Sequence, residues 1–303
     1  MTESDSCSVG PESHDASREP FGEFVVNNLV NGGMTKKLCT SGQGGTYIIS
    51  SAGEPVAVFK PGAEEIGLVT NPRGHDTTER VGFTPGDSWK REILAFKLDH
   101  SSFAGVPETV EVTIEGQRGS LQKFIHGCLE SWSSPPGRYS VRHVHRIAIL
   151  DLRTLNCDRH GGNILVERDR TSLVPIDHAY ILPECFSDPD FEWKDWPQSR
   201  IPFGPPELDY ISRLDPEVDR KLVTDALNSQ AGELIEIFTR VLMFAALRGY
   251  TPRQIASFCR REKLAFPSQL ECLLADSSAT FESDATYDLG RVDDLLSQYF
   301  PRT

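Results

Sequence analysis

One polar segment, Asp158-Arg-His-Gly-Gly-Asn163, constrains what this chain of 303 residues can fold into more than any other part of its sequence. An apolar pattern with helical spacing precedes it over residues 141–155, and an apolar hairpin is predicted after it over 163–176. Polar groups packed between apolar elements lose solvation unless they have partners. The segment therefore predicts a functional site built on a helix and a hairpin.

Three further features stand in a fixed order around this segment. A Gly-rich turn, Gly42-Gln-Gly-Gly-Thr46, enters a predicted hairpin whose second strand carries Lys60, and Ile176-Asp177-His178 closes the later hairpin. Phosphoryl transfer from ATP needs such parts: backbone amides without Cβ bulk, a lysine on a rigid strand, a carboxylate for the acceptor hydroxyl and an Asn–Asp pair for Mg²⁺. The joint order predicts a nucleotide-dependent phosphotransferase.

The spacing assigns a role to each candidate. Asn163 lies five residues after Asp158, as in the protein-kinase catalytic loop, so we predict Asp158 as the catalytic carboxylate and Asn163 with Asp177 as ligands of Mg²⁺ or Mn²⁺. Lys60 is predicted to neutralise phosphate, with Glu92 as its ion-pair partner. The remaining residues predicted to contact the nucleotide are Gly42, Gly44, Gly45, Thr46 and, on the strand face of Lys60, Val58.

The pattern of the whole chain predicts two lobes. Residues 1–20 hold five serines and five acids and are predicted to be disordered. A helix over Phe24–Val30, strands at 47–49, 56–60 and 110–115, a long loop over 61–87 and a helix over 88–99 capped by Asp87 or Ser88 form a strand-rich part. Helices predominate later, apart from an irregular loop over 179–215. We predict an α+β fold with a tail (1–20), a small strand-rich lobe (21–125) and a mainly helical lobe (126–303).

Charge and composition exclude several classes of protein. Acidic residues outnumber basic ones by 44 − 31 = 13, which argues against nucleic-acid binding through bulk charge. The seven cysteines are scattered without a CxxC pair, as expected in a reducing compartment. The longest apolar run, Val241–Leu247, is too short for a transmembrane segment. We expect a cytoplasmic protein, with peripheral membrane contact or a nuclear location as further options.

The order Asp158-Arg159-His160-x-x-Asn163-Ile-Leu resembles the phosphatidylinositol 3-/4-kinase family, because Arg-His follows the aspartate, whereas ordinary protein kinases have His-Arg before it. Neighbouring segments are similar to the gamma-type, type II-like phosphatidylinositol 4-kinases of plants, over roughly residues 40–265. The matching pieces are Gly44-Gly-Thr-Tyr47, Ala57-Val-Phe-Lys-Pro61, Asn71-Pro-Arg-Gly74, Trp89-Lys-Arg-Glu-Ile93, Gly105-Val-Pro107 with Thr109, Gly119-Ser-Leu-Gln122, Pro175-Ile-Asp-His178, and Phe191-Glu-Trp193 with Trp196-Pro197.

This resemblance implies a bilobal, kinase-like fold that uses ATP and Mg²⁺, with Asp158 as catalytic aspartate and His160 assisting it. It implies transfer of the ATP γ-phosphate to a hydroxyl of an inositol lipid, phosphatidylinositol. The gamma-type family is also described as containing Ser/Thr protein kinases, so a protein substrate is the alternative.

The loop after Asp177 bears on this choice of acceptor. Residues 179–203 hold five acids against Lys194 and Arg200, a net charge of −3 that would repel a polyphosphorylated headgroup or recruit a basic protein. Its four large aromatic residues fit either a membrane interface or packing onto the helical lobe. These aromatic residues are Phe186, Phe191, Trp193 and Trp196.

Other functions fit the sequence less well. A metal-dependent hydrolase would use His143 and His145 with the residues around Asp158, but these histidines stand two apart on a predicted helix and face different ways. A nucleotide-binding pseudokinase would not need Lys60 and both aspartates intact. Cys157 suggests redox chemistry only weakly, because no second cysteine is near in sequence.

Overall fold

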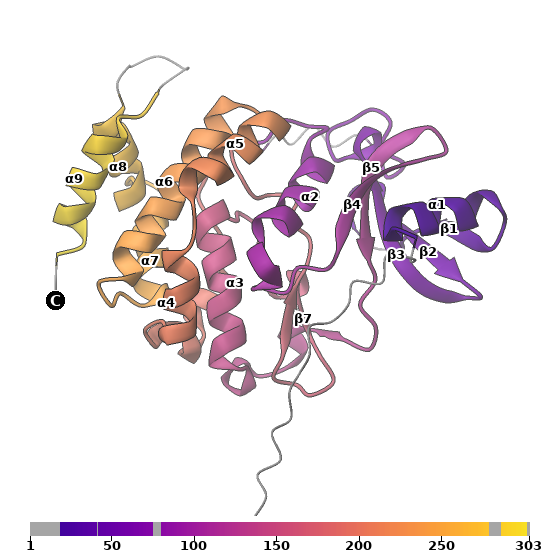
Figure 1. Cartoon of the computed structure of the whole chain (residues 1–303), viewed down its shortest axis with the longest axis horizontal. Helices are drawn as coiled ribbons and strands as arrows, with labels where there is room; N and C mark the ends of the chain where they lie inside the picture. Colours follow the sequence, from indigo (N-terminus) through magenta and orange to yellow (C-terminus); the bar gives the residue numbers. More distant parts are fainter. Residues whose placement is uncertain (1–18, 41, 75–79, 279–285, 302–303) are drawn as a thin grey trace, which may run out of the picture.

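A five-stranded antiparallel sheet forms the first lobe of the protein, which we describe from a computed structural model (Figure 1). The structure describes residues 19–40, 42–74, 80–278 and 286–301, so most of the predicted N-terminal tail lies outside the described residues. The strand order is β1-β2-β3-β5-β4. The strands are β1 (Met34–Leu38), β2 (Tyr47–Ser51), β3 (Glu54–Pro61), β4 (Thr109–Ile114) and β5 (Gln117–Lys123).

Two helices pack on this sheet. Helix α1 (Phe21–Val30) buries Val25 against the apolar side chains of the sheet, among them Ile49, Phe59 and Leu121. Helix α2 (Ser88–Leu98) contacts β4 and β5 and also reaches α5 of the second lobe. It therefore lies between the lobes, as Figure 1 shows.

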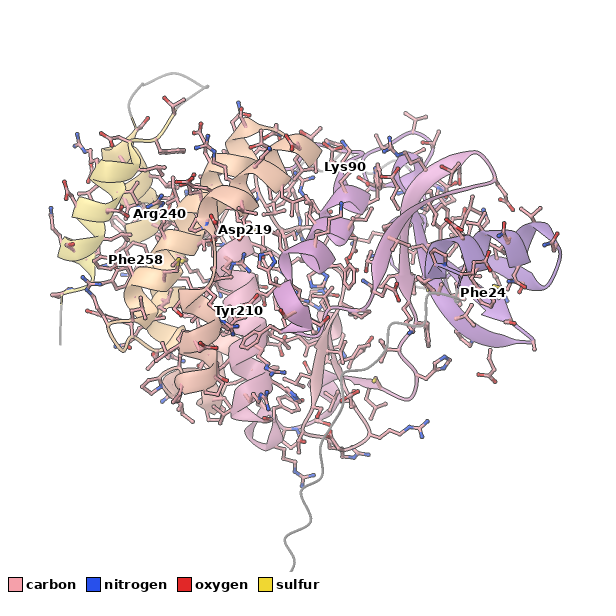
Figure 2. All side chains as sticks on the ribbon, viewed as in Figure 1. Phe24, Lys90, Tyr210, Asp219, Arg240 and Phe258 are labelled. Carbon is pink, nitrogen blue, oxygen red and sulfur yellow. The ribbon has the colours of Figure 1, made fainter. Side chains whose placement is uncertain are left out.

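The second lobe consists mainly of helices, together with a small antiparallel sheet of order β6-β7-β8. Helix α6 is central, because it contacts α3, α4, α5 and α9 and carries an apolar stripe that is buried from Leu234 to Ala245. Figure 2 labels Phe258 of α7, which packs edge-on against Tyr299 of α9. The elements are β6 (Leu129–Glu130), β7 (Ile164–Val166), β8 (Leu173–Pro175), α3 (Val141–Thr154), α4 (Pro205–Ser212), α5 (Pro216–Ala226), α6 (Ser229–Ala246), α7 (Pro252–Cys259), α8 (Gln269–Ser277) and α9 (Leu289–Tyr299).

The α+β class with a strand-rich and a helical lobe is confirmed, and three local predictions need correction. Strands β1 and β5 were not expected, because β1 is an edge strand with two lysines and β5 is mostly polar. The stretch 179–215, predicted as irregular, contains α4, which begins with prolines at its first turn. The division at residue 125 stays a prediction.

The cap of α2 is the third correction. Asp87 holds the N-cap position but makes no cap hydrogen bond with its side chain. Instead, Glu65 accepts hydrogen bonds from the backbone N–H groups of Trp89 (3.0 Å) and Gly86 (2.7 Å). The Glu65 carboxylate thus replaces a local N-cap, although it lies far before the helix in the sequence. It also holds its own part of the 61–87 loop against the start of α2.

Candidate active site

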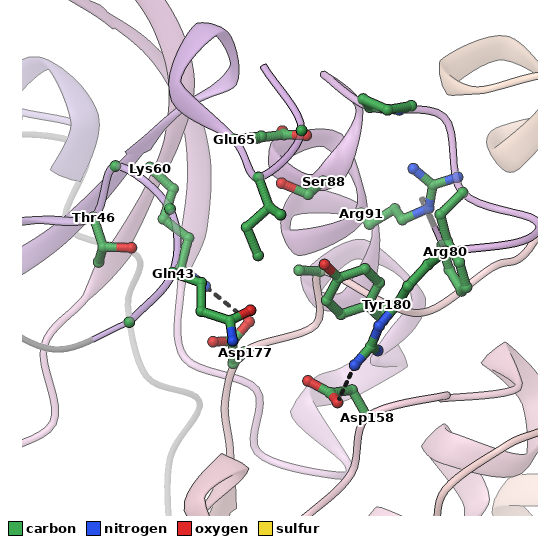
Figure 3. Close-up of a pocket in the computed structure, with 18 of the residues that line it drawn as sticks. Gln43, Thr46, Lys60, Glu65, Arg80, Ser88, Arg91, Asp158, Asp177 and Tyr180 are labelled. Atoms are coloured by element: carbon green, nitrogen blue, oxygen red, sulfur yellow. Dashed lines mark hydrogen bonds and ion pairs between the residues drawn. The ribbon is translucent and has the colours of Figure 1, made fainter. Parts of the chain in front are cut away.

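A cavity of about 550 Å³ lies between the two lobes (Figure 3). It is walled by the Gly-rich turn, by the end of β3, by parts of the 61–87 loop and by the segments that follow α3 and β8. The predicted site residues that line it are Gly42, Gly44, Gly45, Thr46, Lys60, Asp158, His160, Asn163 and Asp177. Folding therefore brings together side chains from four distant parts of the chain.

Lys60 connects both lobes through two carboxylates. Its ammonium group forms an ion pair with Glu92 of α2, and its Nζ lies 3.0 Å from Oδ1 of Asp177. Glu92 is buried and also accepts the backbone N–H of His178 at 3.0 Å. One carboxylate thus holds β3, α2 and the segment after β8 in a fixed relation.

The charges in this group reinforce one another. Burial opposes the charge on Lys60, but Asp177 and Glu92 outweigh it and hold the pKa of this ammonium group above its ordinary value. Burial likewise opposes the charge on Glu92, while Lys60 and the contact with His178 hold the pKa of this carboxyl well below its ordinary value. Both groups are therefore charged near neutral pH.

The Gly-rich turn is held in place by its neighbours. Gly45 donates its N–H to the backbone oxygen of Glu64 (2.8 Å), and a Cβ at Gly45 would overlap the Glu64 side chain. Asn71 donates from Nδ2 to the backbone oxygen of Gln43 (2.9 Å). Glu64 in turn accepts from Tyr47 (2.7 Å), whose pKa is raised to about 12 by burial and by this carboxylate. Only glycine therefore fits at position 45, where the turn lies close to Glu64.

The loop Asp158–Asn163 is braced by a buried arginine. Arg159 Nε lies 3.0 Å from Oδ2 of Asp151 on α3, and both side chains are fully buried. Its Nη1 donates to the backbone oxygens of Asn163 and Ile176, each at 2.6 Å. Asp151 also accepts from Trp193 Nε1 at 2.9 Å. Arg159 thus fixes the two segments that carry Asn163 and Asp177 relative to α3.

His160 has a defined orientation beside Asp158. Its Nδ1 accepts the backbone N–H of Gly162 at 3.0 Å, so the proton of the neutral ring is on Nε2. Nε2 lies 4.0 Å from Oδ2 of Asp158, and His160 lines the cavity. Trp132, which is 60 % exposed, stacks on the imidazole ring with centroids 5.5 Å apart. The geometry presents a proton donor next to the candidate catalytic carboxylate.

Asn163 and Asp177 lie at the two ends of the β7–β8 hairpin, as expected. Asn163 donates from Nδ2 to the backbone oxygen of Asp158 at 2.9 Å, so its Oδ1, the atom suited to a metal, points away from that contact. Asp177 has a positive φ of 54°, a strained conformation for a residue other than glycine. Its carboxylate is half-exposed on the cavity side.

These residues fit MgATP. The cavity volume suits a nucleotide, the Gly-rich turn offers backbone amides, Lys60 offers a positive charge, and Asn163 and Asp177 offer the oxygen donors that Mg²⁺ prefers. The side chains that would hold the metal are one amide and one carboxylate. By contrast, the part of the chain that the structure describes holds no group of three His, Cys, Asp or Glu side chains suited to a metal ion.

The metal-hydrolase interpretation is therefore wrong for the described histidines. His145 is buried, with Nε2 3.1 Å from the backbone oxygen of Gln198, whereas His143 accepts the N–H of Leu173 at 3.3 Å. Burial raises the pKa of the Cys157 thiol to about 12, which disfavours the reactive thiolate, and its Sγ lies 3.2 Å from the backbone oxygen of Leu155.

The structure does not bring all candidates into the cavity. Val58 lies on β3 but does not line it. Glu92 lies behind Lys60 rather than at the surface of the cavity.

The loop after Asp177 differs most from its prediction. Phe191, Trp193 and Trp196 are buried in the core of the second lobe, so the packing alternative is correct for them and they are not available to a membrane. Its acids are paired within the protein: Asp195 with Arg253 (2.9 Å) and Asp190 with Arg260 (3.5 Å).

Two further acids of the loop also have partners within the protein. Asp188 accepts the backbone N–H of Arg261 at 2.9 Å, and Glu184 pairs with Arg91 at 2.9 Å. Three of the five acids of the loop thus have an arginine partner, whereas Asp188 and Glu192 accept backbone N–H groups. The effect of the loop's net charge on the choice of acceptor stays a prediction.

Arg80 is a cavity residue that the sequence did not reveal. Its Nη2 lies 3.0 Å from Oδ1 of Asp158, as Figure 3 shows, and it comes from the 61–87 loop. A single arginine in a polar loop carries no periodic or spacing signal, and its partner lies 78 residues away. Only the tertiary structure identifies it.

Comparison of the sequence with known proteins shows the family of this chain. The family described as phosphatidylinositol 3- and 4-kinase matches residues 63–247, more than half of the chain. Phosphatidylinositol 4-kinase gamma 8 of Arabidopsis thaliana is 36% identical over 300 residues, covering 86% of this chain and 56% of that protein. Phosphatidylinositol 4-kinase gamma 4 of Oryza sativa subsp. japonica is 37% identical over 286 residues, covering 84% and 51%. The chain thus spans about half the length of these curated relatives.

Among solved structures, the Helicobacter pylori proinflammatory kinase CtkA matches with a TM-score of 0.41 and 11% identity, covering 73% of this chain and 94% of that one. The resemblance inferred from the Asp-Arg-His order and the predicted kinase-like fold are confirmed by the family match. This chain belongs to the phosphatidylinositol 3- and 4-kinase family.

Proposed function

We propose that the protein is a phosphatidylinositol 4-kinase that transfers the γ-phosphoryl group of ATP to an inositol hydroxyl of phosphatidylinositol. The observation that carries the proposal is the convergence of Lys60, Asp158, Asn163 and Asp177 with the Gly-rich turn on one cavity. The lipid acceptor is supported by the names of the relatives. ATP supplies the phosphoryl group, and Mg²⁺ supplies charge neutralisation when bound.

Each side chain has one role in this scheme. Lys60 neutralises phosphate oxygens and is held in position by Glu92. Asn163 and Asp177 hold the metal, and the backbone of Gly42, Gly44, Gly45 and Thr46 covers the phosphates. This arrangement lowers the barrier mainly by positioning and electrostatics.

Asp158 orients the acceptor hydroxyl and takes its proton as the new bond forms between the acceptor oxygen and the γ-phosphorus. The bond between that phosphorus and its bridging oxygen breaks, and ADP leaves with the bridging oxygen. His160 donates from Nε2 toward the reacting oxygens, since its Nδ1 is occupied by the Gly162 N–H. It therefore acts as a stabilising donor rather than as the base.

Membrane contact, if it accompanies this activity, needs a surface other than the three buried rings of the loop after Asp177. Within the described ranges, none of the helices is long and apolar enough to span a bilayer. A cytoplasmic or nuclear location remains a proposal.

The acceptor is tested by offering both classes of substrate to the purified protein. We expect MgATP-dependent labelling of phosphatidylinositol in mixed micelles, no labelling of casein, and no labelling of either by Asp158→Asn. The matched control is Asp209→Asn, which removes an exposed carboxylate of α4 whose ion-pair partner among the described residues is Arg213, one turn further along. Label on casein alone would make this a Ser/Thr protein kinase on the same scaffold, and label on neither would leave a nucleotide-binding pseudokinase.

A further inference from the structure

Arg80 is held in a built position at the candidate catalytic carboxylate. Its Nη2 lies 3.0 Å from Oδ1 of Asp158, and its guanidinium carbon lies 3.9 Å from the centroid of the Tyr180 ring. Stacking on an aromatic ring and pairing with a carboxylate fix the plane of a guanidinium group. The side chain is directed into the cavity, as Figure 3 shows.

The backbone that carries Arg80 is anchored to the second lobe. Glu184 accepts from Oγ1 (2.8 Å) and N–H (3.3 Å) of Thr84, and its own N–H donates to the backbone oxygen of Gly82 at 2.8 Å. Phe83 packs edge-on against Tyr180 with centroids 5.3 Å apart. Segment 80–86 thus forms a wall of the cavity beside Asp158, and Arg80 is preorganised on it.

Three described residues lining the cavity carry a lysine or arginine charge, and two of them pair with carboxylates other than Asp158. Lys60 is bound by Glu92 and Asp177. Arg91 is bound by Glu184 at 2.9 Å and by the backbone oxygen of Ile181 at 3.0 Å. The third, Arg80, pairs with Asp158, the carboxylate that must orient the acceptor hydroxyl during transfer.

We propose that Arg80 is a further catalytic residue, which binds an oxygen of the transferred phosphoryl group and stabilises its charge in the transition state. The inference rests on the proposed function. The acceptor hydroxyl sits at Asp158 and the phosphoryl group moves onto it, so the charge develops within reach of a guanidinium already hydrogen-bonded to that carboxylate. A guanidinium has five N–H donors, so it can serve Asp158 and a phosphoryl oxygen together. An arginine in this position, supplied by the chain itself, accelerates phosphoryl transfer by about 10³–10⁵-fold in other nucleotide enzymes.

The same guanidinium chemistry would suit the phosphodiester of the lipid headgroup, so the experiment must separate the two phosphates. The variants are Arg80→Ala and Arg80→Lys. Arg118→Ala is the matched control, because Arg118 also pairs with a carboxylate (Glu111) and lies over an aromatic ring (Trp89), but is exposed and does not line the cavity. Turnover is measured at varied phosphatidylinositol, and the binding of Mg-ADP is compared with that of Mg-ADP plus aluminium fluoride, a mimic of the transferred group.

For Arg80→Ala we expect kcat to fall by about 10³-fold or more, an unchanged KM for phosphatidylinositol, and loss of most of the preference for the fluoride complex over ADP. Arg80→Lys should recover part of both, and Arg118→Ala should match the wild type. A raised KM for the lipid with unchanged kcat and fluoride preference would instead assign Arg80 to the lipid phosphate and overturn the proposal. Equal or faster turnover would show that Arg80 merely masks Asp158.

Failure of the proposed function gives a different pattern. If the wild type labels neither lipid nor protein, that function is wrong, yet the fluoride preference still decides whether Arg80 contacts the phosphoryl position. Preference retained in Arg80→Ala refutes the inference in every case.

Discussion

Replacing Arg159 by methionine should destabilise the protein strongly, because it leaves the Asp151 carboxylate buried without a counter-ion. Arg159 and Asp151 are both fully buried, with Nε and Oδ2 3.0 Å apart. Removing one member of a buried ion pair costs about 3–5 kcal/mol. The backbone oxygens of Asn163 and Ile176 also lose a charged donor at 2.6 Å. Since a domain is stable by only about 5–15 kcal/mol, Arg159→Met should lose a large part of its free energy of unfolding.

A double-mutant cycle isolates the pair. In Asp151→Asn with Arg159→Met neither of these two positions carries a buried charge, and Asn can still accept from Trp193 Nε1, which lies 2.9 Å from Asp151 Oδ2. The two changes should therefore couple by about 2–3 kcal/mol, the double variant being more stable than the sum of the single effects predicts. The assay is urea unfolding followed by tryptophan fluorescence.

The exposed pair Arg213–Asp209 is the control for this cycle, because its side chains are 70% and 66% exposed. Arg213→Met should change the free energy of unfolding by less than about 1 kcal/mol. If the changes in the free energy of unfolding at Asp151 and Arg159 were additive within about 0.5 kcal/mol, the ion pair would not stabilise the loop Asp158–Asn163 as inferred here.

Other residues give further expectations. In acid, below the ordinary Glu pKa of 4.5, the free energy of unfolding should fall with decreasing pH, because the pKa of Glu92 is lower in the folded state and the unfolded chain binds the extra proton. In denaturant titrations at pH 3–5, the free energy of unfolding of Glu92→Gln should fall less steeply than that of the wild type. Gly45→Ala should weaken ATP binding about tenfold or more in calorimetry, since its Cβ would overlap a neighbouring side chain, while Gly137→Ala, with open space at its Cβ, should bind as the wild type. Native alkylation followed by mass spectrometry should label exposed Cys185 and spare Cys157, whose pKa is raised to about 12 by burial.

The sequence predicted those elements whose pattern is local. Helix α2 lies where it was expected, over Ser88–Leu98. The apolar spacing of α6 and the Thr251–Pro252 start of α7 are local signals of the same kind, and Thr251 accepts the N–H of Gln254. Strand β5 was not predicted from the sequence, because its pairing with β3 and β4 stabilises it rather than an apolar pattern of its own side chains. Its Gly119 is required because a Cβ there would overlap the backbone of Lys60 on β3.

For the site, order and spacing were sufficient to find several residues at the cavity, but neither Arg80 nor the residues that hold the site in place. Asp158, Asn163 and Asp177 stand at recognisable intervals, whereas Asp151 is one polar residue on a helix and gives no sign that it binds a buried arginine. Arg80 and Glu65 act through contacts with residues far along the chain. Such long-range partners depend on tertiary packing, which a periodic pattern does not encode.

The most direct test of a phosphotransfer site at this cavity is to separate binding from turnover in Asp158→Asn. MgATP affinity by calorimetry and label transfer to phosphatidylinositol are measured on the same preparation, with Asp209→Asn as control. We expect ATP affinity within about twofold of the wild type, because a carboxylate that acts on the acceptor contributes to the transition state rather than to nucleotide binding, and a loss of turnover of about 10²–10⁴-fold or more. Wild-type turnover in Asp158→Asn would contradict the account.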